Sequence, residues 1–176
     1  AGLIAVSEVM RAVLDVRAAG IPVIVLVGSA NGCFGGMGIV ARCTDHVVMS
    51  DIGRLAMSGP EVIEASHGVE EFDARDRALV WRTTGGKHRW LSGDCDALVD
   101  DDIHAFRDAA LAALDIHPAV TLESLQAEHA LLLDRLARLP EDLDGDVEAL
   151  TLWHRLGVAN PAGVSALDVD AVRALR

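Results

Sequence analysis

The chain has 176 residues, of which 51% are hydrophobic, so it is long and apolar enough to bury the core of one ordinary domain with an appendage. Its 27 acidic and 15 basic residues give a net charge of -12, which argues against nucleic acid or an anionic membrane surface as a main partner. The sequence has no run of about 18 apolar residues, so we expect no membrane span.

Periodicity predicts that helices and strands alternate over residues 1–117. An amphipathic helix over 3–17 ends at Gly20, and the apolar run 21–27 is expected to be a strand buried on both faces. The other expected elements of this part are a short helix over 37–43, strands over 45–50 and 54–58, helices over 61–66 and 74–82, a pair of strands over 88–92 and 97–99, and a helix over 102–114. The alternation predicts an α/β domain.

Residues 118–176 have a helical pattern throughout. Leucine spacing indicates one long helix face over 122–139 and a second over 147–156. Ser165 followed by Asp168 is a weak capping box for a last helix. This helical C-terminal extension has no site signature, so we interpret it as packing or docking structure.

The cysteines and the first residue indicate the cellular compartment and the extent of the chain. The three cysteines have no C-x-x-C spacing, which favours free thiols in the cytoplasm. The chain begins at Ala1 and directly in helical pattern, so we expect that an N-terminal part is missing.

The glycine-rich stretch 28–38, here called the glycine bend, is the strongest candidate for a site. A strand that passes through such a bend into a helix leaves N–H groups of the first helical turn without partners, and these favour negative charge. A Walker A loop and a nucleophile elbow are absent, and a dinucleotide fingerprint can only be forced from Gly36, Gly38 and Ala41. Two interpretations stay open: an oxyanion hole formed by the amides of Gly35 and Gly36, or a tight packing bend.

Metal binding is not predicted. Cys43 and His46 have C-x-x-H spacing, but no second pair lies near them in the sequence. A small buried residue is the simpler interpretation of Cys43.

Three stretches resemble the crotonase superfamily, within it the carboxyltransferase branch, and most of all the beta subunit of biotin-independent malonate decarboxylase. They are G-C-F-G-G-M-G at 32–38, S-G-P-E-V-I-E at 58–64 and the long segment 70–89, and the match runs from about residue 21 to residue 106. The resemblance implies a ClpP/crotonase spiral of ββα units, incomplete at its N-terminus, with the helical extension added.

Departures from the superfamily narrow the expected activity. Enoyl-thioester hydratases place a catalytic glutamate where this chain has Gly38, so hydration is not expected. Glu61 matches the second hydratase glutamate, whereas acetyl-thioester carboxylases have a basic residue there. Bacterial carboxylase subunits also carry a four-cysteine zinc ribbon, which three scattered cysteines cannot form.

The resemblance implies loss of carbon dioxide from a malonyl thioester to give an acetyl thioester. The malonyl group would be carried on the coenzyme-A-derived prosthetic group of an acyl carrier protein, without biotin or any cofactor bound directly to this chain. Gly35 and Gly36 would stabilise the enolate oxyanion, and Glu61 is the candidate for proton transfer, although a glutamate in the first turn of a helix also complements the helix dipole. A carboxyltransferase subunit of an acyl-CoA carboxylase and a non-catalytic interaction subunit remain the alternatives.

Two clusters are expected to contact the substrate or its prosthetic group. The first is in the bend and consists of Cys33, Phe34 and Met37. The second consists of Lys87, His88 and Arg89, at the end of a basic segment that also includes Arg75, Arg77 and Arg82. Phosphates or an acidic carrier surface would suit the basic cluster. Internal ion pairing is the alternative, and Lys87 and Arg89 are preferred because no acidic residue adjoins them in the sequence.

The resemblance also implies partners: a gamma subunit, the acyl carrier protein and an acyl-carrier transferase subunit. In the superfamily a first oxyanion donor lies on a loop well upstream of the glycine pair. Only one helix and one strand precede Gly35 here, so we expect that the chain is not active alone.

Overall fold

The computed structural model describes residues 2–29, 31–116, 121–138 and 149–176. The elements are α1 (Gly2–Ala18), β1 (Ile24–Val27), α2 (Gly36–Ala41), β2 (His46–Ser50), α3 (Pro60–His67), α4 (Arg77–Thr84), α5 (Gly86–Ser92), β3 (Ala97–Val99), α6 (Ile103–Ala113), α7 (Leu122–Ala137), α8 (Ala149–Arg155), the 3₁₀ helix η1 (Pro161–Ala166) and α9 (Val169–Arg173). Helices thus alternate with three strands, which confirms the α/β class.

The chain divides into two compact units. One contains residues 1–117 together with 167–176, and the other contains 118–166. The last ten residues, which the sequence pattern grouped with the helical extension, therefore pack with the first unit. There α9 contacts α5 and β3, and the Arg173 side chain donates to the Leu98 carbonyl.

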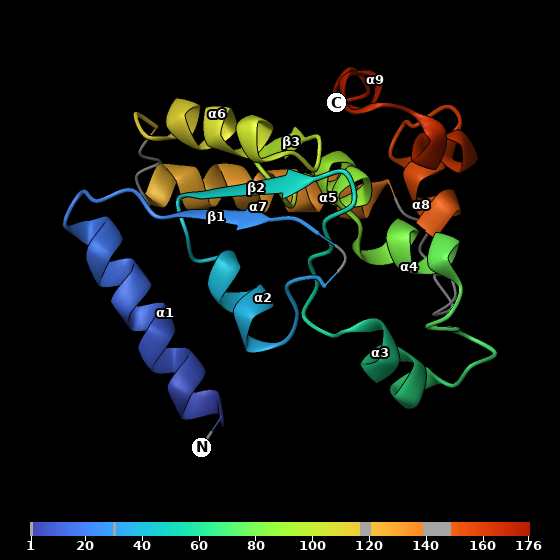
Figure 1. The fold of residues 1–176 in the computed structure, drawn as a ribbon, viewed down its shortest axis with the longest axis horizontal. Helices are drawn as coiled ribbons and strands as arrows, with labels where there is room; N and C mark the ends of the chain where they lie inside the picture. Colours follow the sequence, from blue (N-terminus) through green and yellow to red (C-terminus); the bar gives the residue numbers. More distant parts are fainter. Residues whose placement is uncertain (1, 30, 117–120, 139–148) are drawn as a thin grey trace. The chain divides into compact units, whose positions relative to one another are not determined.

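A three-stranded parallel sheet in the order β1-β2-β3 forms the centre of the first unit. In Figure 1, α6 lies along the upper side of this sheet and α2 lies below it. One core cluster joins the sheet, α2 and the segment after β2; its members are Val27, Ala41, Val47, Met49, Leu55 and Cys95. This core fixes Val27 at the end of β1, the strand that leads into the glycine bend.

The sheet departs from the sequence prediction in two places. Leu26 in β1 is 50% exposed, so β1 is not buried on both faces; β1 also lies at the edge of the described sheet and pairs only with β2. The predicted strand over 54–58 is reduced to isolated bridges, between Cys33 and Leu55 and between Arg54 and Gly85.

Two helices of the first unit differ from the sequence prediction, one in its type and one in its first residue. The predicted strand over 88–92 is wrong: those residues belong to α5, which ends at Gly93 in the left-handed conformation. Helix α4 begins at Arg77 instead of residue 74, because the Asp76 carboxylate accepts hydrogen bonds from the N–H groups of Ala78 and Leu79.

In the second unit, the predicted helices over 122–139 and 147–156 correspond to α7 and α8; residues 139–148 lie outside the described residues. Helix α8 packs against η1, and Trp153, Val158 and Val164 are buried. The sequence predicted Ser165 as the cap of the last helix, but the N-cap of α9 is Asp168, and Ser165 lies in the preceding 3₁₀ helix η1. Among the described residues, no helix is long and apolar enough to cross a membrane.

Candidate functional site

The glycine bend is anchored at its start to the connection between β3 and α6. The N–H of Ser29 donates to Asp101 Oδ1 at 2.9 Å, and Ser29 has φ 64°, which is unusual outside glycine. A Cβ at Gly28 would lie 2.8 Å from both the Asp101 carboxylate and the Phe106 ring. Glycine is therefore needed at position 28 by close approach, and the bend begins from a fixed point.

The middle of the bend is hydrogen-bonded to the segment after β2. Cys33 N–H donates to the Arg54 carbonyl at 2.7 Å, Ala56 N–H donates to the Cys33 carbonyl at 3.2 Å, and Gly35 N–H donates to the Met57 carbonyl at 3.0 Å. The Gly35 N–H thus already has a protein acceptor in this structure. Gly35 has φ 64°, a backbone conformation that glycine adopts more readily than other residues do.

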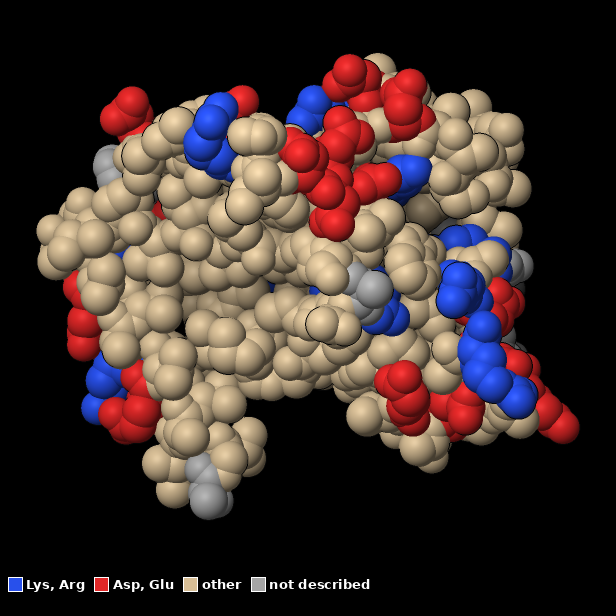
Figure 2. All heavy atoms as spheres, in the orientation of Figure 1, with Lys and Arg blue, Asp and Glu red and all other residues tan. Residues whose placement is uncertain are grey.

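The amides that follow are available. Gly36 is the first residue of α2, and within the described part of the chain the N–H groups of Gly36 and Met37 have no hydrogen-bond partner. Met37 is 60% exposed, as is expected of a residue at an accessible helix start. In Figure 2 the surface over α2 is a broad uncharged area, so no carboxylate on this face competes for these amides.

Position 38 has no room for a side chain. A Cβ at Gly38 would lie 2.3 Å from the Ala56 carbonyl oxygen, which belongs to the backbone hydrogen-bonded to Cys33. The glutamate that hydratases carry at the corresponding position would therefore not fit here. Gly36 differs, because its Cβ would meet the side chain of Val6 in α1 at 2.5 Å.

Phe34 and Cys33 have different surroundings. The Phe34 ring lies beside Arg54, whose guanidinium carbon is 5.7 Å from the ring centroid. The Cys33 thiol is half-buried, and burial raises its pKa, so it stays protonated near neutral pH. Cys33 is therefore a packing residue whose backbone, more than its thiol, shapes the bend.

Glu61 lies in the first turn of α3 and is exposed. A Cβ built on Gly59 would be 3.7 Å from Glu61 Oε2 and 3.6 Å from the Phe34 ring, so the carboxylate and the bend share one neighbourhood. Its position also allows it to complement the dipole of α3.

Lys87 and Arg89 of the basic cluster make hydrogen bonds and an ion pair within the first unit. Lys87 Nζ donates to the Leu167 carbonyl at 2.6 Å. Arg89 pairs with Asp94 at 2.9 Å and donates to the Thr83 carbonyl at 3.0 Å. No acidic residue adjoins Arg89 in the sequence, but the left-handed turn at Gly93 brings Asp94 back onto α5, so the preference for Arg89 as an unpaired cation is wrong.

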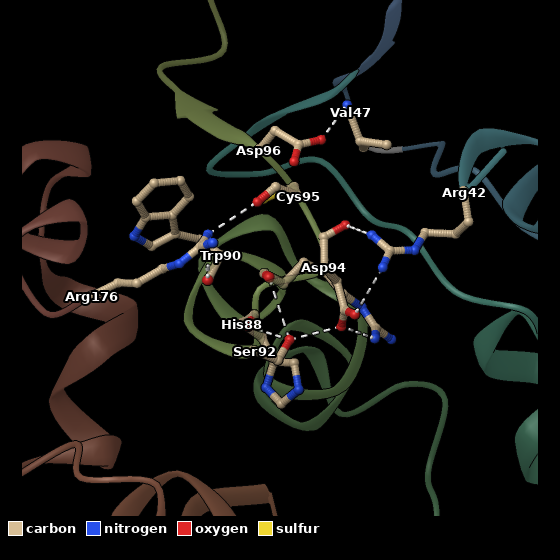
Figure 3. A network of polar contacts seen from close by, with 10 residues as sticks. Arg42, Val47, His88, Trp90, Ser92, Asp94, Cys95, Asp96 and Arg176 are labelled. Atoms are coloured by element: carbon tan, nitrogen blue, oxygen red, sulfur yellow. Dashed lines mark hydrogen bonds and ion pairs between the residues drawn. The ribbon is translucent and has the colours of Figure 1, made fainter. Parts of the chain in front are cut away.

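Figure 3 shows Arg42 and Ser92 beside Asp94. The Asp94 carboxylate accepts a hydrogen bond from Ser92 and forms ion pairs with Arg42 and Arg89. Burial alone would raise the pKa of Asp94, but the hydrogen bonds from Arg89 and Ser92 and the nearby Arg charges outweigh it and lower the pKa below its ordinary value. Arg176 closes the same region by donating to the Cys95 carbonyl and lying over the Trp90 ring. These contacts hold the α5–β3 connection together.

His88 is buried on the inner side of α5. Desolvation, helped by the Arg89 charge, lowers its pKa to about 3, so the ring is neutral at physiological pH. A buried, uncharged imidazole is a poor phosphate ligand.

Sequence reasoning missed two residues that line the bend. Arg54 lies between the rings of Phe34 and Trp81, and Met57, which is 70% exposed, accepts the Gly35 hydrogen bond. No sequence pattern could have found them, because the three segments involved are brought together only by backbone hydrogen bonds across the fold. Among the described residues, no group of three or more His, Cys, Asp or Glu side chains is arranged to hold a metal ion.

No protein-family model matches the chain. In sequence it is 40% identical over 178 residues to the malonyl-S-ACP:biotin-protein carboxyltransferase MADC of Malonomonas rubra, a match that covers 97% of this chain and 54% of that protein. The chain therefore spans about half the length of this relative.

Two solved structures from Pseudomonas are similar. One is a chain of a malonate decarboxylase hetero-tetramer in complex with malonate, with TM-score 0.74 and 34% identity over 88% of this chain and 54% of that chain. The other is a chain of the malonate decarboxylase MdcD-MdcE hetero-dimer, with TM-score 0.60 and 32% identity over 77% of this chain and 54% of that one. Over about half of their length, the chain is thus similar in sequence and fold to components of malonate decarboxylase and malonyl-thioester carboxyltransferase.

Proposed function

We propose that this chain is part of a beta subunit of malonate decarboxylase, which converts a malonyl thioester on an acyl carrier protein to an acetyl thioester in the cytoplasm. The observation that carries the proposal is the similarity, at TM-score 0.74 over 88% of the chain, to a chain of a malonate decarboxylase. We further propose that the three parallel strands are one portion of a crotonase-like spiral of ββα units whose remainder lies in the other half of a longer protein.

The reaction breaks the bond between the carboxylate carbon and the α-carbon of the malonyl group. Carbon dioxide leaves, the electron pair passes into an enolate whose charge rests on the thioester oxygen, and a proton then adds to the α-carbon. The accessible N–H of Gly36 would donate to that oxygen, where a donor counts most because the charge is larger in the transition state than in the substrate. Glu61 would deliver the proton.

The proposal includes partners. Helix α1 has no buried residue, and apolar side chains of the first unit are exposed on it; Leu3, Ile4, Val9, Leu14 and Val16 are the examples. Exposed apolar surface of this kind favours an interface with other protein. A gamma subunit would cover it and complete the site, and the acyl carrier protein and an acyl-carrier transferase subunit would supply the substrate. One donor leaves the oxyanion half-compensated, so the chain would be inactive alone.

A second candidate is transfer of the carboxyl group to a biotin protein. It is favoured by the 40% identity to a malonyl-S-ACP:biotin-protein carboxyltransferase. The first step would be the same, with the same need for an oxyanion donor. The carbon dioxide would then bond to a biotin nitrogen of the acceptor protein, with loss of the proton from that nitrogen, instead of leaving.

One experiment separates these candidates. The full-length subunits are combined with malonyl-S-acyl carrier protein labelled in its free carboxylate, with and without a biotin protein. Acetyl thioester formed without the biotin protein supports decarboxylation, and label on biotin supports transfer. An intact malonyl thioester under both conditions, with a correctly assembled complex, would leave only a non-catalytic interaction subunit.

A further inference from the structure

The backbone at Arg54 is fixed from both sides. Its carbonyl accepts the hydrogen bond from Cys33 in the glycine bend at 2.7 Å, while the next residue, Leu55, donates to the Thr84 carbonyl at the end of α4 at 2.8 Å. Arg54 also forms an antiparallel bridge with Gly85. The side chain therefore starts from a rigid position between the bend and α4.

Two aromatic rings hold the guanidinium of Arg54. Its central carbon lies 5.7 Å from the centroid of Phe34 and 5.2 Å from the centroid of Trp81. Both distances are within the range of cation–π attraction, which positions the cation without neutralising it. Arg54 thus places a positive charge beside the bend.

The guanidinium of Arg54 has no hydrogen bond or ion pair with the described residues. Its Nε is buried and has no hydrogen-bond partner, and within the described residues no carboxylate lies within the ion-pair distance of 4.0 Å. Arg17 and Arg89 differ from Arg54 in having a carboxylate partner, Asp45 at 2.8 Å and Asp94 at 2.9 Å, although Arg89 Nε is also buried without a hydrogen-bond partner. Arg54 therefore places beside the bend a guanidinium that has no carboxylate partner among the described residues, and such a group suits an anionic ligand.

We propose that Arg54, held between Phe34 and Trp81, binds an anionic oxygen group of the malonyl thioester, and this inference rests on the proposed function. Planar guanidinium groups suit carboxylate and phosphate oxygens equally. The substrate has both, in the free carboxylate of the malonyl group and in the phosphate of its prosthetic group. Phe34 connects the two sites, because its ring contacts Arg54 while its backbone lies two residues before Gly36.

The test uses the full-length complex with Arg54→Met, which keeps a long apolar stem between the rings and removes the charge. Arg107→Met on α6 is the matched control, because Arg107 is 60% exposed and pairs only with its neighbour Asp108. Four thioesters are compared: malonyl- and acetyl-pantetheine, and the same two with the phosphate. The malonyl forms are assayed as substrates and the acetyl forms as inhibitors.

We expect KM for malonyl-phosphopantetheine to rise by about tenfold or more in Arg54→Met, as for other charged hydrogen bonds, with no change in Arg107→Met. If the carboxylate is the ligand, malonyl-pantetheine shows the same rise and both acetyl thioesters inhibit as before. If the phosphate is the ligand, acetyl-phosphopantetheine is weakened and malonyl-pantetheine is not. The inference is overturned if all four constants stay within twofold of the unsubstituted complex, or if acetyl-pantetheine is weakened as much as the rest.

A binding measurement separates this inference from the proposed function. Calorimetric titration with malonate and with inorganic phosphate needs no turnover. Loss of binding of either anion in Arg54→Met, with the thermal unfolding midpoint unchanged, supports Arg54 as the ligand even if the unsubstituted complex turns over no thioester. Retained binding of both anions overturns the inference, whichever reaction the complex performs.

Discussion

Replacing Gly38 by alanine should destabilise the first unit and distort the glycine bend. The added Cβ would stand 2.3 Å from the Ala56 carbonyl oxygen, where ordinary contact begins at 3.4 Å, so one backbone segment must move by about 1 Å. That movement strains the hydrogen bonds between Cys33 and Ala56 and between Gly35 and Met57. Overpacking and weakened hydrogen bonds together predict a loss of about 3 kcal/mol in the free energy of unfolding.

Urea unfolding of the full-length protein measures this loss. Gly36→Ala is the matched comparison, because its Cβ meets the side chain of Val6 instead of backbone. Adding Val6→Ala should restore most of the stability of Gly36→Ala, whereas nothing comparable can relieve Gly38→Ala. A Gly38→Ala protein as stable as the unsubstituted protein would refute the close approach of Gly38 to residue 56.

Two further predictions concern titratable groups. The pKa of His88 is lowered from 6.5 to about 3, so below pH 6.5 the unfolded chain binds a proton that the folded chain does not. The free energy of unfolding therefore falls as pH decreases from 6.5 toward 3, by on the order of 5 kcal/mol in total. His88→Gln should flatten this dependence in urea unfolding at pH 7 and pH 5, and equal slopes in both proteins would contradict it. Glu61→Gln should remove one ionisation from the pH profile of kcat/KM in the assembled complex, whereas an unaltered profile would reduce Glu61 to a residue that complements the dipole of α3.

Long periodic segments were predictable from the sequence. The apolar residues spaced three and four apart in residues 3–17 identified α1, although none of its residues is buried in this structure, and the apolar run at 45–50 identified β2, of which the last four residues are buried. Residues 88–92 were misread because they are too short to show a period. The glycines on either side, Gly86 at the first turn and Gly93 in the left-handed conformation, were the available signal of a short helix.

The candidate site was predictable only in part. The glycine bend could be found from its composition, but the sequence could not tell that Gly35 N–H is taken by the Met57 carbonyl while Gly36 N–H has no partner in the described chain. That distinction comes from the bridge between Cys33 and Leu55, which pairs residues more than twenty positions apart. Arg54 was missed for the same reason, since its two aromatic neighbours lie in segments far from it in the sequence.

The proposed oxyanion donor is tested most directly by removing the N–H of Gly36 alone. Proline at position 36 is compatible with the first turn of a helix, but its Cβ would meet Val6 as the Cβ of alanine does, so both variants are made with Val6→Ala. The two double variants then have the same added Cβ and differ chiefly in the N–H. In the assembled complex, we predict that kcat for the malonyl thioester is about 10²–10³-fold lower with proline than with alanine. Equal turnover of the two folded double variants would contradict the assignment of Gly36 as the donor.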